Sequence, residues 1–338
     1  MDLKATYLTT LQRCAPDALV QRHVRPDMPR NVVAIGKCAA ALLAGVASVH
    51  PIDNAFSAVP EGYPLPKIGT VFVGGHPHYT RASFAAGHAL LDFVESHDDL
   101  LFLVSGGGSA CVEVPLVSEE EAMRINAQLI ASGKPIGAIN EERRRISAIK
   151  GGKLAQRVRG RAVTLVYSDV GTGALHDVAS GPTLPGSEAI LVADNATLVR
   201  AAAQIIGDNA VVLEEQVECD VLEAAAMLAA RARELRKGEV LVAGGEPTVV
   251  VRGNGRGGRC SELAVRFASL CPYEALFASS DGVDGNSGCA GIHLGAGLKR
   301  DLHFDDSSSF AVAAQIGEPI MIAPTGNNLR DLFFVARD

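Results

Sequence analysis

The stretch LLFLVSGGGSACVEVP, residues 100–115, joins a continuous apolar run to three successive glycines. A short apolar run that ends in a glycine turn is typical of a buried strand in a parallel sheet. Glycines directly after such a strand let the backbone approach a bound group closely, and their N–H groups can surround an anion. The turn is unlike a flexible linker, and its two serines add hydroxyl donors. We therefore predict phosphate-binding residues at Ser105, Gly106, Gly107, Gly108 and Ser109.

Short apolar runs alternate with amphipathic stretches along the whole chain, which predicts an α/β fold with a parallel sheet covered by helices. The expected strands are Val32–Ile35, Val71–Gly74, Leu100–Val104, Ala162–Tyr167, Val211–Leu213, Val240–Ala243, Val249–Val251, Ala275–Ala278 and Ile320–Ala323. The expected helices include Ala82–Glu95, Glu119–Ser132, Ile146–Arg157, Asn195–Ile206 and Cys219–Leu235.

The length of 338 residues favours two domains, because single hydrophobic cores rarely grow beyond about 250–300 residues. The clearest change in composition lies at Arg231–Glu239, where a charged helix end closes with Lys237 and Gly238. Close-set strands and short glycine loops follow. We therefore predict domains at residues 1–236 and 237–338.

The overall composition excludes several classes of protein. A formal net charge of −7 argues against a general nucleic-acid binder. The seven cysteines are an odd number without a CxxC pair, which indicates neither a disulfide framework nor a zinc site and fits a reducing compartment. No apolar stretch approaches 18 residues and the N-terminus has no signal core, so neither membrane insertion nor secretion is indicated. We expect a cytoplasmic protein.

Two further strand ends carry charged residues. Lys37 follows the strand Val32–Ile35 and precedes a helix, where backbone N–H groups and the helix dipole favour a phosphate. A solvated lysine at a helix start is the alternative interpretation. Asp169 follows the strand Ala162–Tyr167, a usual position for a carboxylate that binds Mg²⁺, although such a residue can also cap a turn.

Other residues complete the candidate site. Glu246 and Asp281 also follow expected strands, and we predict that they contact the substrate together with Arg143. The segment Asn140–Leu154 places Arg143, Ser147 and Lys150 on one face of an expected helix. Such a basic stripe can bind a triphosphate or a carboxylate, and we predict Lys150 as a phosphate ligand. A solvated cationic helix face is the alternative.

The segment Gly253–Gly258 has the spacing GxGxxG, follows an expected strand and precedes an expected helix. This spacing is the fingerprint of dinucleotide binding, and Asp281 lies at about the distance the fingerprint requires. The arginines Arg256 and Arg259 in and beside the turn weaken the match, because small residues normally allow the helix to pack closely there. A nicotinamide-dependent reductase is therefore the second functional hypothesis.

Eight strings in order resemble the glycerate 2-kinase family, whose members pair a glycerate kinase domain with a C-terminal MOFRL domain. They are AIGKCAAALLAG, GGHP, LVSGGGSA, INEERRRISAIKGGKLA, SDV with ASGPT, GGEPTVVVRGNGRGGR, SDGVDG and PTGNN. The resemblance implies a Rossmann-like three-layer domain with a parallel sheet, followed by a smaller MOFRL-like α/β domain. Some members have been labelled hydroxypyruvate reductases.

The resemblance further implies transfer of a phosphoryl group from ATP, with Mg²⁺, to a small hydroxy acid, with D-glycerate yielding 2-phosphoglycerate. Lys37 would occupy the family's essential lysine position and Arg259 its essential arginine position. Asp169 would bind Mg²⁺ or steer the attacking hydroxyl. The expected partners are then ATP and the hydroxy acid, and neither nucleic acid nor a membrane is expected. A homodimer is possible, and the sequence leaves the oligomeric state undecided.

The chain also departs from the family pattern. Cys260–Glu262 replace an Asn-Gln-Glu string, Thr172–Ala174 replace Gly-Asp-Asp, and His78–Thr80 replace a segment with a Pro-Asp pair. Acidic and amide groups are thereby lost from turns that face ligands. A non-catalytic homologue, or one with another substrate, is therefore the third hypothesis.

Overall fold

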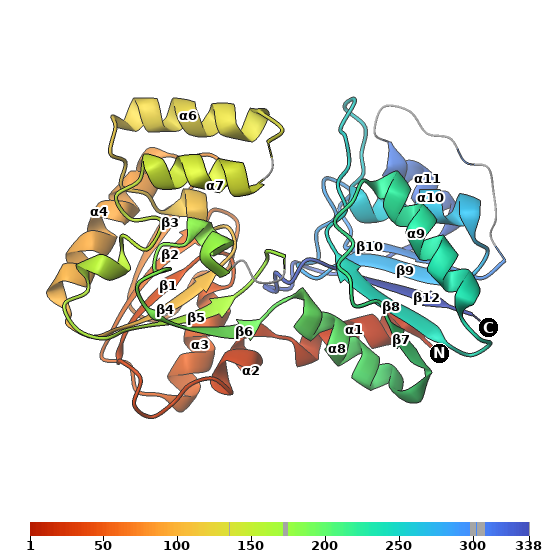
Figure 1. Cartoon of the computed structure of the whole chain (residues 1–338), viewed down its shortest axis with the longest axis horizontal. Helices are drawn as coiled ribbons and strands as arrows, with labels where there is room; N and C mark the ends of the chain where they lie inside the picture. Colours follow the sequence, from red (N-terminus) through yellow and green to blue (C-terminus); the bar gives the residue numbers. More distant parts are fainter. Residues whose placement is uncertain (135, 172–174, 298–301, 303–307, 338) are drawn as a thin grey trace. The chain divides into compact units, whose positions relative to one another are not determined.

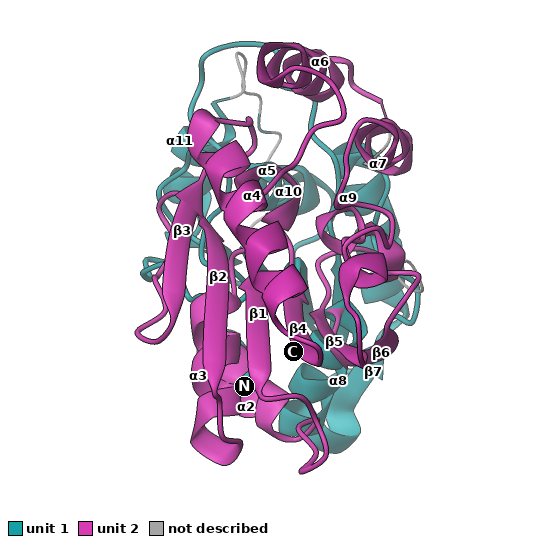
Figure 2. Cartoon of the chain, turned by 90° about the vertical axis from the view of Figure 1, so that its left-hand side faces the viewer, with its two compact units in different colours: residues 1–14, 195–338 teal, residues 15–194 magenta. Residues whose placement is uncertain are grey.

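The computed structural model describes residues 1–134, 136–171, 175–297, 302 and 308–337. It contains two compact units, which Figure 2 colours separately. Unit 1 comprises residues 1–14 and 195–338, and unit 2 comprises residues 15–194. Within the described ranges, no helix combines the length and apolar character that crossing a membrane requires.

Unit 2 is built on a six-stranded sheet in the order β3-β2-β1-β4-β5-β6, and all of its strand pairs are parallel (Figure 1). The strands are β1 (Asn31–Ile35), β2 (Asn54–Pro60), β3 (Thr70–Gly74), β4 (Leu100–Ser105), β5 (Ala162–Tyr167) and β6 (Glu188–Ala193). The strand order reverses between β1 and β4. In open parallel sheets, such a switch point is where ligands bind, beyond the carboxyl ends of the strands.

Helices cover both faces of this sheet, as expected for right-handed crossovers that leave β1 and β3 in opposite directions. The helices of unit 2 are α2 (Pro16–Gln21), α3 (Ala39–Val49), α4 (Arg81–Ser96), α5 (Gly108–Cys111), α6 (Glu119–Ala131) and α7 (Ile136–Arg145). Two 3-10 segments, η1 (Ala155–Arg157) and η2 (Leu175–Ser180), follow. Helix α4 packs Leu90 and Val94 into a buried core with Phe56 and Phe102 of the strands. The predicted α/β fold with a parallel sheet is confirmed.

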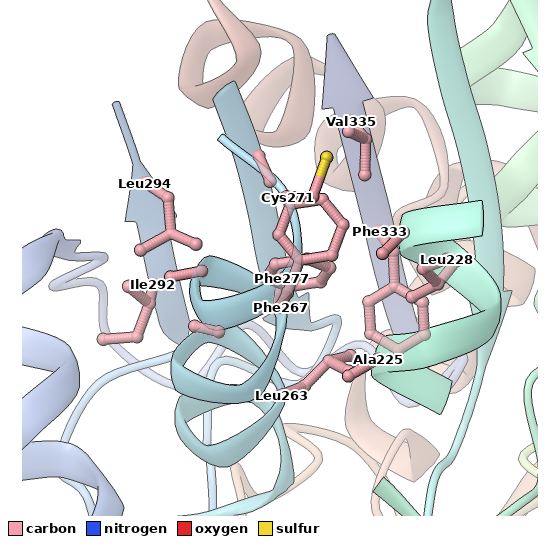
Figure 3. Packing of buried hydrophobic residues seen from close by; sticks show 14 of the residues in the cluster. Ala225, Leu228, Leu263, Phe267, Cys271, Phe277, Ile292, Leu294, Phe333 and Val335 are labelled. Carbon is pink, nitrogen blue, oxygen red and sulfur yellow. The ribbon is translucent and has the colours of Figure 1, made fainter. Parts of the chain in front are cut away.

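Unit 1 contains a mixed sheet in the order β11-β10-β9-β12-β8-β7, in which only β7 and β8 are parallel. The strands are β7 (Ala210–Val212), β8 (Val240–Gly245), β9 (Glu274–Ser279), β10 (Gly291–Leu294), β11 (Glu318–Pro319) and β12 (Asp331–Ala336). The helices are α1 (Leu3–Arg13), α8 (Asn195–Ile206), α9 (Val221–Glu234), α10 (Arg259–Leu270) and α11 (Ser309–Ile316), with the 3-10 segment η3 (Gly207–Asn209). Figure 3 shows the core between α9, α10 and the sheet, where Phe267, Phe277 and Phe333 pack together.

The division into compact units does not coincide with the boundary expected near residue 237. Strand β7 pairs with β8, and α8 packs on both strands, so residues 195–236 belong to the C-terminal sheet. The first helix, α1, packs on α8 and so belongs to the same unit. Charged composition marks the exposed end of α9, but it does not reveal which sheet the helix covers.

Three expected elements do not form as predicted. Val249–Val251 is not a strand, because Val250 and Val251 are 64% and 74% exposed and have no sheet face to cover. Ile320–Ala323 is not a strand either, since the edge strand β11 ends at Pro319. The helix expected over Ile146–Arg157 is also wrong, because α7 ends at Arg145 and turns follow until η1. Strands β2, β6, β10, β11 and β12 were not predicted from the sequence.

Candidate functional site

The turns after β1 and β4 meet at the switch point of the unit 2 sheet. The backbone N–H of Lys37 donates to the carbonyl of Gly106 at 2.8 Å. The Ser105 hydroxyl, which is fully buried, donates to the carbonyl of Ile35 at 3.2 Å and accepts from the N–H of Cys38 at 3.1 Å. Ser105 therefore fixes the two turns to each other, so the predicted lysine and the predicted glycine turn are neighbours.

Two glycines are required for this approach. Gly36 has φ +107°, and a Cβ there would lie 2.4 Å from the carbonyl oxygen of Ser105. Gly107 has φ +81°, and its Cβ would lie 2.8 Å from Cγ of Lys37. Positive φ and this crowding both exclude a larger residue. The stem of Lys37 therefore lies along the glycine turn, and its ammonium is 5.5 Å from the centre of the Tyr63 ring.

The far end of the glycine turn is held by a chain of hydroxyl and amide groups. The Ser109 hydroxyl lies 2.8 Å from that of Ser180, which donates to Oδ1 of Asn140 at 2.8 Å. Asn140 in turn donates to the carbonyl of Asp177 at 3.3 Å. Ser109 is thus tied to η2 and α7, so the turn forms a fixed backbone surface rather than a flexible loop.

His76, which lies in the GGHP string, was not predicted as a candidate site residue. His76 follows β3, so it lies at the same edge of the sheet as Lys37. Partial desolvation of the ring, together with the smaller effects of the Lys37 and Arg143 charges, lowers the pKa of His76 to about 4. The imidazole is therefore neutral beside two cations, and the edge carries an excess of positive charge suited to an anion.

Arg143 and Lys150 do not share a helix face, because α7 ends before Lys150. Both side chains are buried, which excludes the alternative of a solvated cationic face. Lys150 forms an ion pair with the equally buried Glu113, which also accepts from the Tyr79 hydroxyl at 2.9 Å and the Ser147 hydroxyl at 2.5 Å. The ammonium already has its carboxylate, so this placement favours a structural role over the predicted phosphate contact.

Asp169 lies just after β5, next to the glycine turn that follows β4 in the same sheet, and its side chain is partly buried. No group of three or more His, Cys, Asp or Glu side chains in the described ranges could hold a metal ion. Mg²⁺ in phosphoryl-transfer sites needs only one or two carboxylates, since phosphates and waters complete its shell. A single carboxylate at this edge fits that donor set. The neighbouring Thr172–Ala174, where the family pattern has acids, lie outside the described residues.

In unit 1, Arg259 begins α10 and points at β12. Its Nε and Nη2 donate to the two carboxylate oxygens of Asp331 at 2.5 and 2.8 Å, and its Nη1 lies 3.2 Å from Glu246. Asp331 is fully buried, and burial raises its pKa to about 6 against the opposing charge of Arg259. Asp331 therefore occupies one edge of the guanidinium, and the Nη1 end pairs with the partly exposed Glu246, which a ligand anion would have to displace.

The other predicted residues of unit 1 also lie at the carboxyl ends of strands. Glu246 follows β8 and is 41% exposed at its side chain, between Arg259 and Arg330. Asp281 follows β9 and accepts from the Ser279 hydroxyl at 2.8 Å and the Val283 N–H at 2.9 Å, as a turn-capping aspartate does. It stays a prediction that the same ligand contacts Lys37 and also Arg259, Glu246 and Asp281.

The segment Gly253–Gly258 lacks the structural context of a dinucleotide fingerprint. No strand leads directly into it, because residues 249–251 form a loop in which Val250 and Val251 are exposed. The helix that follows begins at Arg259, and the buried carboxylate of Asp284 accepts from the N–H groups of Cys260 and Ser261 at 2.9 Å each. An acidic side chain thus occupies the helix N-terminus where a pyrophosphate would bind.

A parallel sheet whose switch point combines a lysine with a fixed glycine turn belongs to the phosphate-binding α/β proteins. Comparison with known proteins makes this assignment narrower. A family described as a domain of unknown function, DUF4147, matches residues 2–208, and the MOFRL family matches residues 239–331. Two relatives are a D-glycerate 2-kinase from Thermotoga maritima and a glycerate 2-kinase from Sulfurisphaera tokodaii. The Thermotoga protein is 30% identical over a region that covers 84% of this chain and 81% of the relative. The Sulfurisphaera protein is also 30% identical, over 80% of this chain and 79% of the relative.

The crystal structure of glycerate kinase from Thermotoga maritima resembles this chain with a TM-score of 0.88 at 26% identity, covering 99% of this chain and 98% of that one. The chain therefore belongs to the glycerate 2-kinase family, with DUF4147 and MOFRL domains, as the eight strings indicated. Membership in this family confirms the prediction of a small-molecule kinase, whose reaction depends on ATP.

Proposed function

We propose that this protein transfers the γ-phosphoryl group of ATP to the 2-hydroxyl of D-glycerate. The main support is the contact between Lys37 and the glycine turn at the switch point of the parallel sheet. Phosphoryl transfer needs little covalent chemistry from the protein and depends on positioning and charge. A cation held beside the backbone N–H groups of a glycine turn supplies both. The names of the relatives supply the acid.

In the proposed reaction, the hydroxyl oxygen of glycerate attacks the γ-phosphorus as the bond to the ADP oxygen breaks. Lys37 offsets charge on the transferring group, and the N–H groups of Gly106–Ser109 orient the phosphates. Asp169 holds Mg²⁺ or accepts the hydroxyl proton. Mg²⁺, when bound with ATP, would neutralise phosphate charge. Arg259 is proposed to pair with an anionic group of a ligand that displaces Glu246 from its Nη1 end.

The experiment is an ADP-release assay with a panel of small hydroxy acids, followed by identification of the phosphorylated position by ³¹P NMR. We expect ADP formation with D-glycerate and a product that carries the phosphate on C2. Lys37→Ala should abolish ADP formation, whereas Lys67→Ala, which removes an exposed lysine of the same unit, should retain it. Wild-type protein that forms no ADP with any acid, or that oxidises NADH with hydroxypyruvate, would refute the proposal.

Two further features belong to the proposal. The cysteine pattern and the composition support a cytoplasmic location. The sequence leaves the oligomeric state open between monomer and homodimer, and light scattering on the purified protein distinguishes the two.

A further inference from the structure

Arg143 is a buried cation without a carboxylate partner of its own. Its side chain lies in α7 and the residue is 7% exposed. Its Nε and Nη2 both donate to Oδ1 of Asn126, at 3.1 and 3.0 Å. Among the described residues, no acidic side chain forms an ion pair with it and no hydrogen bond involves its Nη1. Because burial of an unpaired guanidinium is costly, this arrangement requires a physical reason.

The nearest acid does not supply the missing charge. Glu113 attracts Arg143, but it is already paired with Lys150. Two buried cations therefore share one carboxylate, and one positive charge remains uncompensated. His76 cannot compensate it, since the ring is neutral or positive and its pKa is lowered by Arg143 and Lys37.

Asn126 determines how the guanidinium points. The residue is 1% exposed, and while its Oδ1 accepts from Arg143, its Nδ2 donates at 3.2 Å to the carbonyl of Pro77, next to His76. Asn126 therefore connects Arg143 to the turn after β3 through a neutral acceptor. This contact occupies the Nε and Nη2 edge and leaves the charge of the guanidinium intact, with the Nη1 end free of hydrogen bonds to the described residues.

We propose that Arg143, oriented by Asn126, binds an oxyanion of a substrate through its Nη1 end, beside His76. The oxyanion is either the carboxylate of the hydroxy acid or a phosphate of ATP, since a guanidinium binds both in the same bidentate way. Naming these two ligands rests on the proposed function, whereas the anion site itself does not. Asn126 is then a positioning residue, and its neutrality matters as much as its hydrogen bonds.

The test replaces Asn126 by its charged isostere. In Asn126→Asp, a carboxylate would pair with Arg143 and compensate its charge. We expect the dissociation constant of the bound ligand to rise about tenfold or more, because the new carboxylate offsets the charge of Arg143 that attracts the anion. Asn209→Asp adds the same charge at an exposed position of the other unit and should leave binding unchanged. Circular dichroism checks that each variant is folded.

Binding is measured without catalysis, by NMR of the His76 ring, whose signal is assigned by its loss in His76→Gln. D-glycerate, inorganic phosphate and ATP are titrated separately. We expect at least one of them to raise the pKa of His76, since an anion beside Arg143 offsets its repulsion. The ligand whose affinity falls in Asn126→Asp shows which oxyanion Arg143 binds. A fall for D-glycerate alone indicates the carboxylate of the hydroxy acid, and a fall for both inorganic phosphate and ATP indicates a phosphate of ATP.

Two results would overturn the proposal: a His76 signal that responds to none of the three ligands, or affinities in Asn126→Asp that stay within about twofold of wild type. If Asn126→Asp does not fold, Arg143→Met removes the buried charge and should weaken the affinity of the responding ligand about tenfold or more, with any remaining His76 response due to Lys37. Affinities in Arg143→Met that stay within about twofold of wild type also refute the proposal. A protein that binds these anions but releases no ADP would refute the proposed kinase activity and leave the anion site supported.

Discussion

Replacing Lys150 by methionine tests the structural role that its buried ion pair with Glu113 indicates. Both residues are almost completely buried, at 1% and 0% exposure. Removing one partner of such a pair leaves the other charge without compensation in a medium of low dielectric constant, which typically costs about 3–5 kcal/mol. We therefore expect Lys150→Met to lower the free energy of unfolding of unit 2 by about that amount.

The double variant Glu113→Gln with Lys150→Met removes both charges. A glutamine keeps an oxygen that can accept from the Val114 N–H and the Ser147 hydroxyl, which donate to Glu113 at 2.8 and 2.5 Å. Replacing both members of a buried pair is often nearly neutral. The double variant should therefore regain most of the stability that Lys150→Met loses, so the two substitutions are strongly non-additive in the cycle.

The assay is urea denaturation followed by far-ultraviolet circular dichroism, since the chain has no tryptophan to report by fluorescence. Lys67→Met, at an exposed position, is the matched control and should change stability little. The reasoning is refuted if Lys150→Met unfolds within about 1 kcal/mol of wild type while its affinity for phosphate falls. That result would restore Lys150 as a phosphate ligand.

Three further perturbations follow from the geometry. Gly107→Ala forces a Cβ into a positive-φ position against Lys37, so we expect a loss of about 1–2 kcal/mol of stability in urea and a lower rate of ADP release. Arg259→Lys loses the bidentate contact with buried Asp331. We therefore expect a lower rate of ADP release and a loss of about 1–3 kcal/mol in the stability of unit 1. A rate and a stability both close to wild type would exclude the role assigned to Arg259. Because the pKa of His76 is lowered from 6.5 to about 4 on folding, the unfolded chain binds an extra proton between these values, and stability falls as pH decreases through this range. His76→Gln should weaken this acid sensitivity in urea titrations at several pH values, and an unchanged pH dependence would contradict the assignment.

The sequence predicted the parts of the fold and site that depend on local order along the chain. Strands β1, β4 and β5 are mainly apolar runs followed by glycine or polar residues, and few other structures suit such runs. Parallel strands share one edge for their carboxyl ends, so Lys37 and the glycine turn were expected at the same edge, whereas the pairing of β1 with β4 that makes them neighbours came from the structure.

Contacts between residues distant in the chain could not be predicted in the same way. Lys150 and Glu113 are 37 residues apart, and Arg259 and Asp331 are 72 apart, so no local pattern pairs them. The basic run after Asn140 reads as one helix, but burial of Lys150 against Glu113 requires the chain to turn after Arg145. Asn126 carries no signal in the sequence, since its role depends entirely on where Arg143 and Pro77 lie in the fold.

The most direct test of the central claim is a crystal structure with a non-hydrolysable ATP analogue and D-glycerate. We expect the terminal phosphate within hydrogen-bonding distance of the Lys37 ammonium and of backbone N–H groups in Gly106–Ser109, beyond the carboxyl ends of β1 and β4. A triphosphate bound elsewhere, with Lys37 and the glycine turn contacting no part of it, would contradict the claim that this edge of the sheet is the phosphate site.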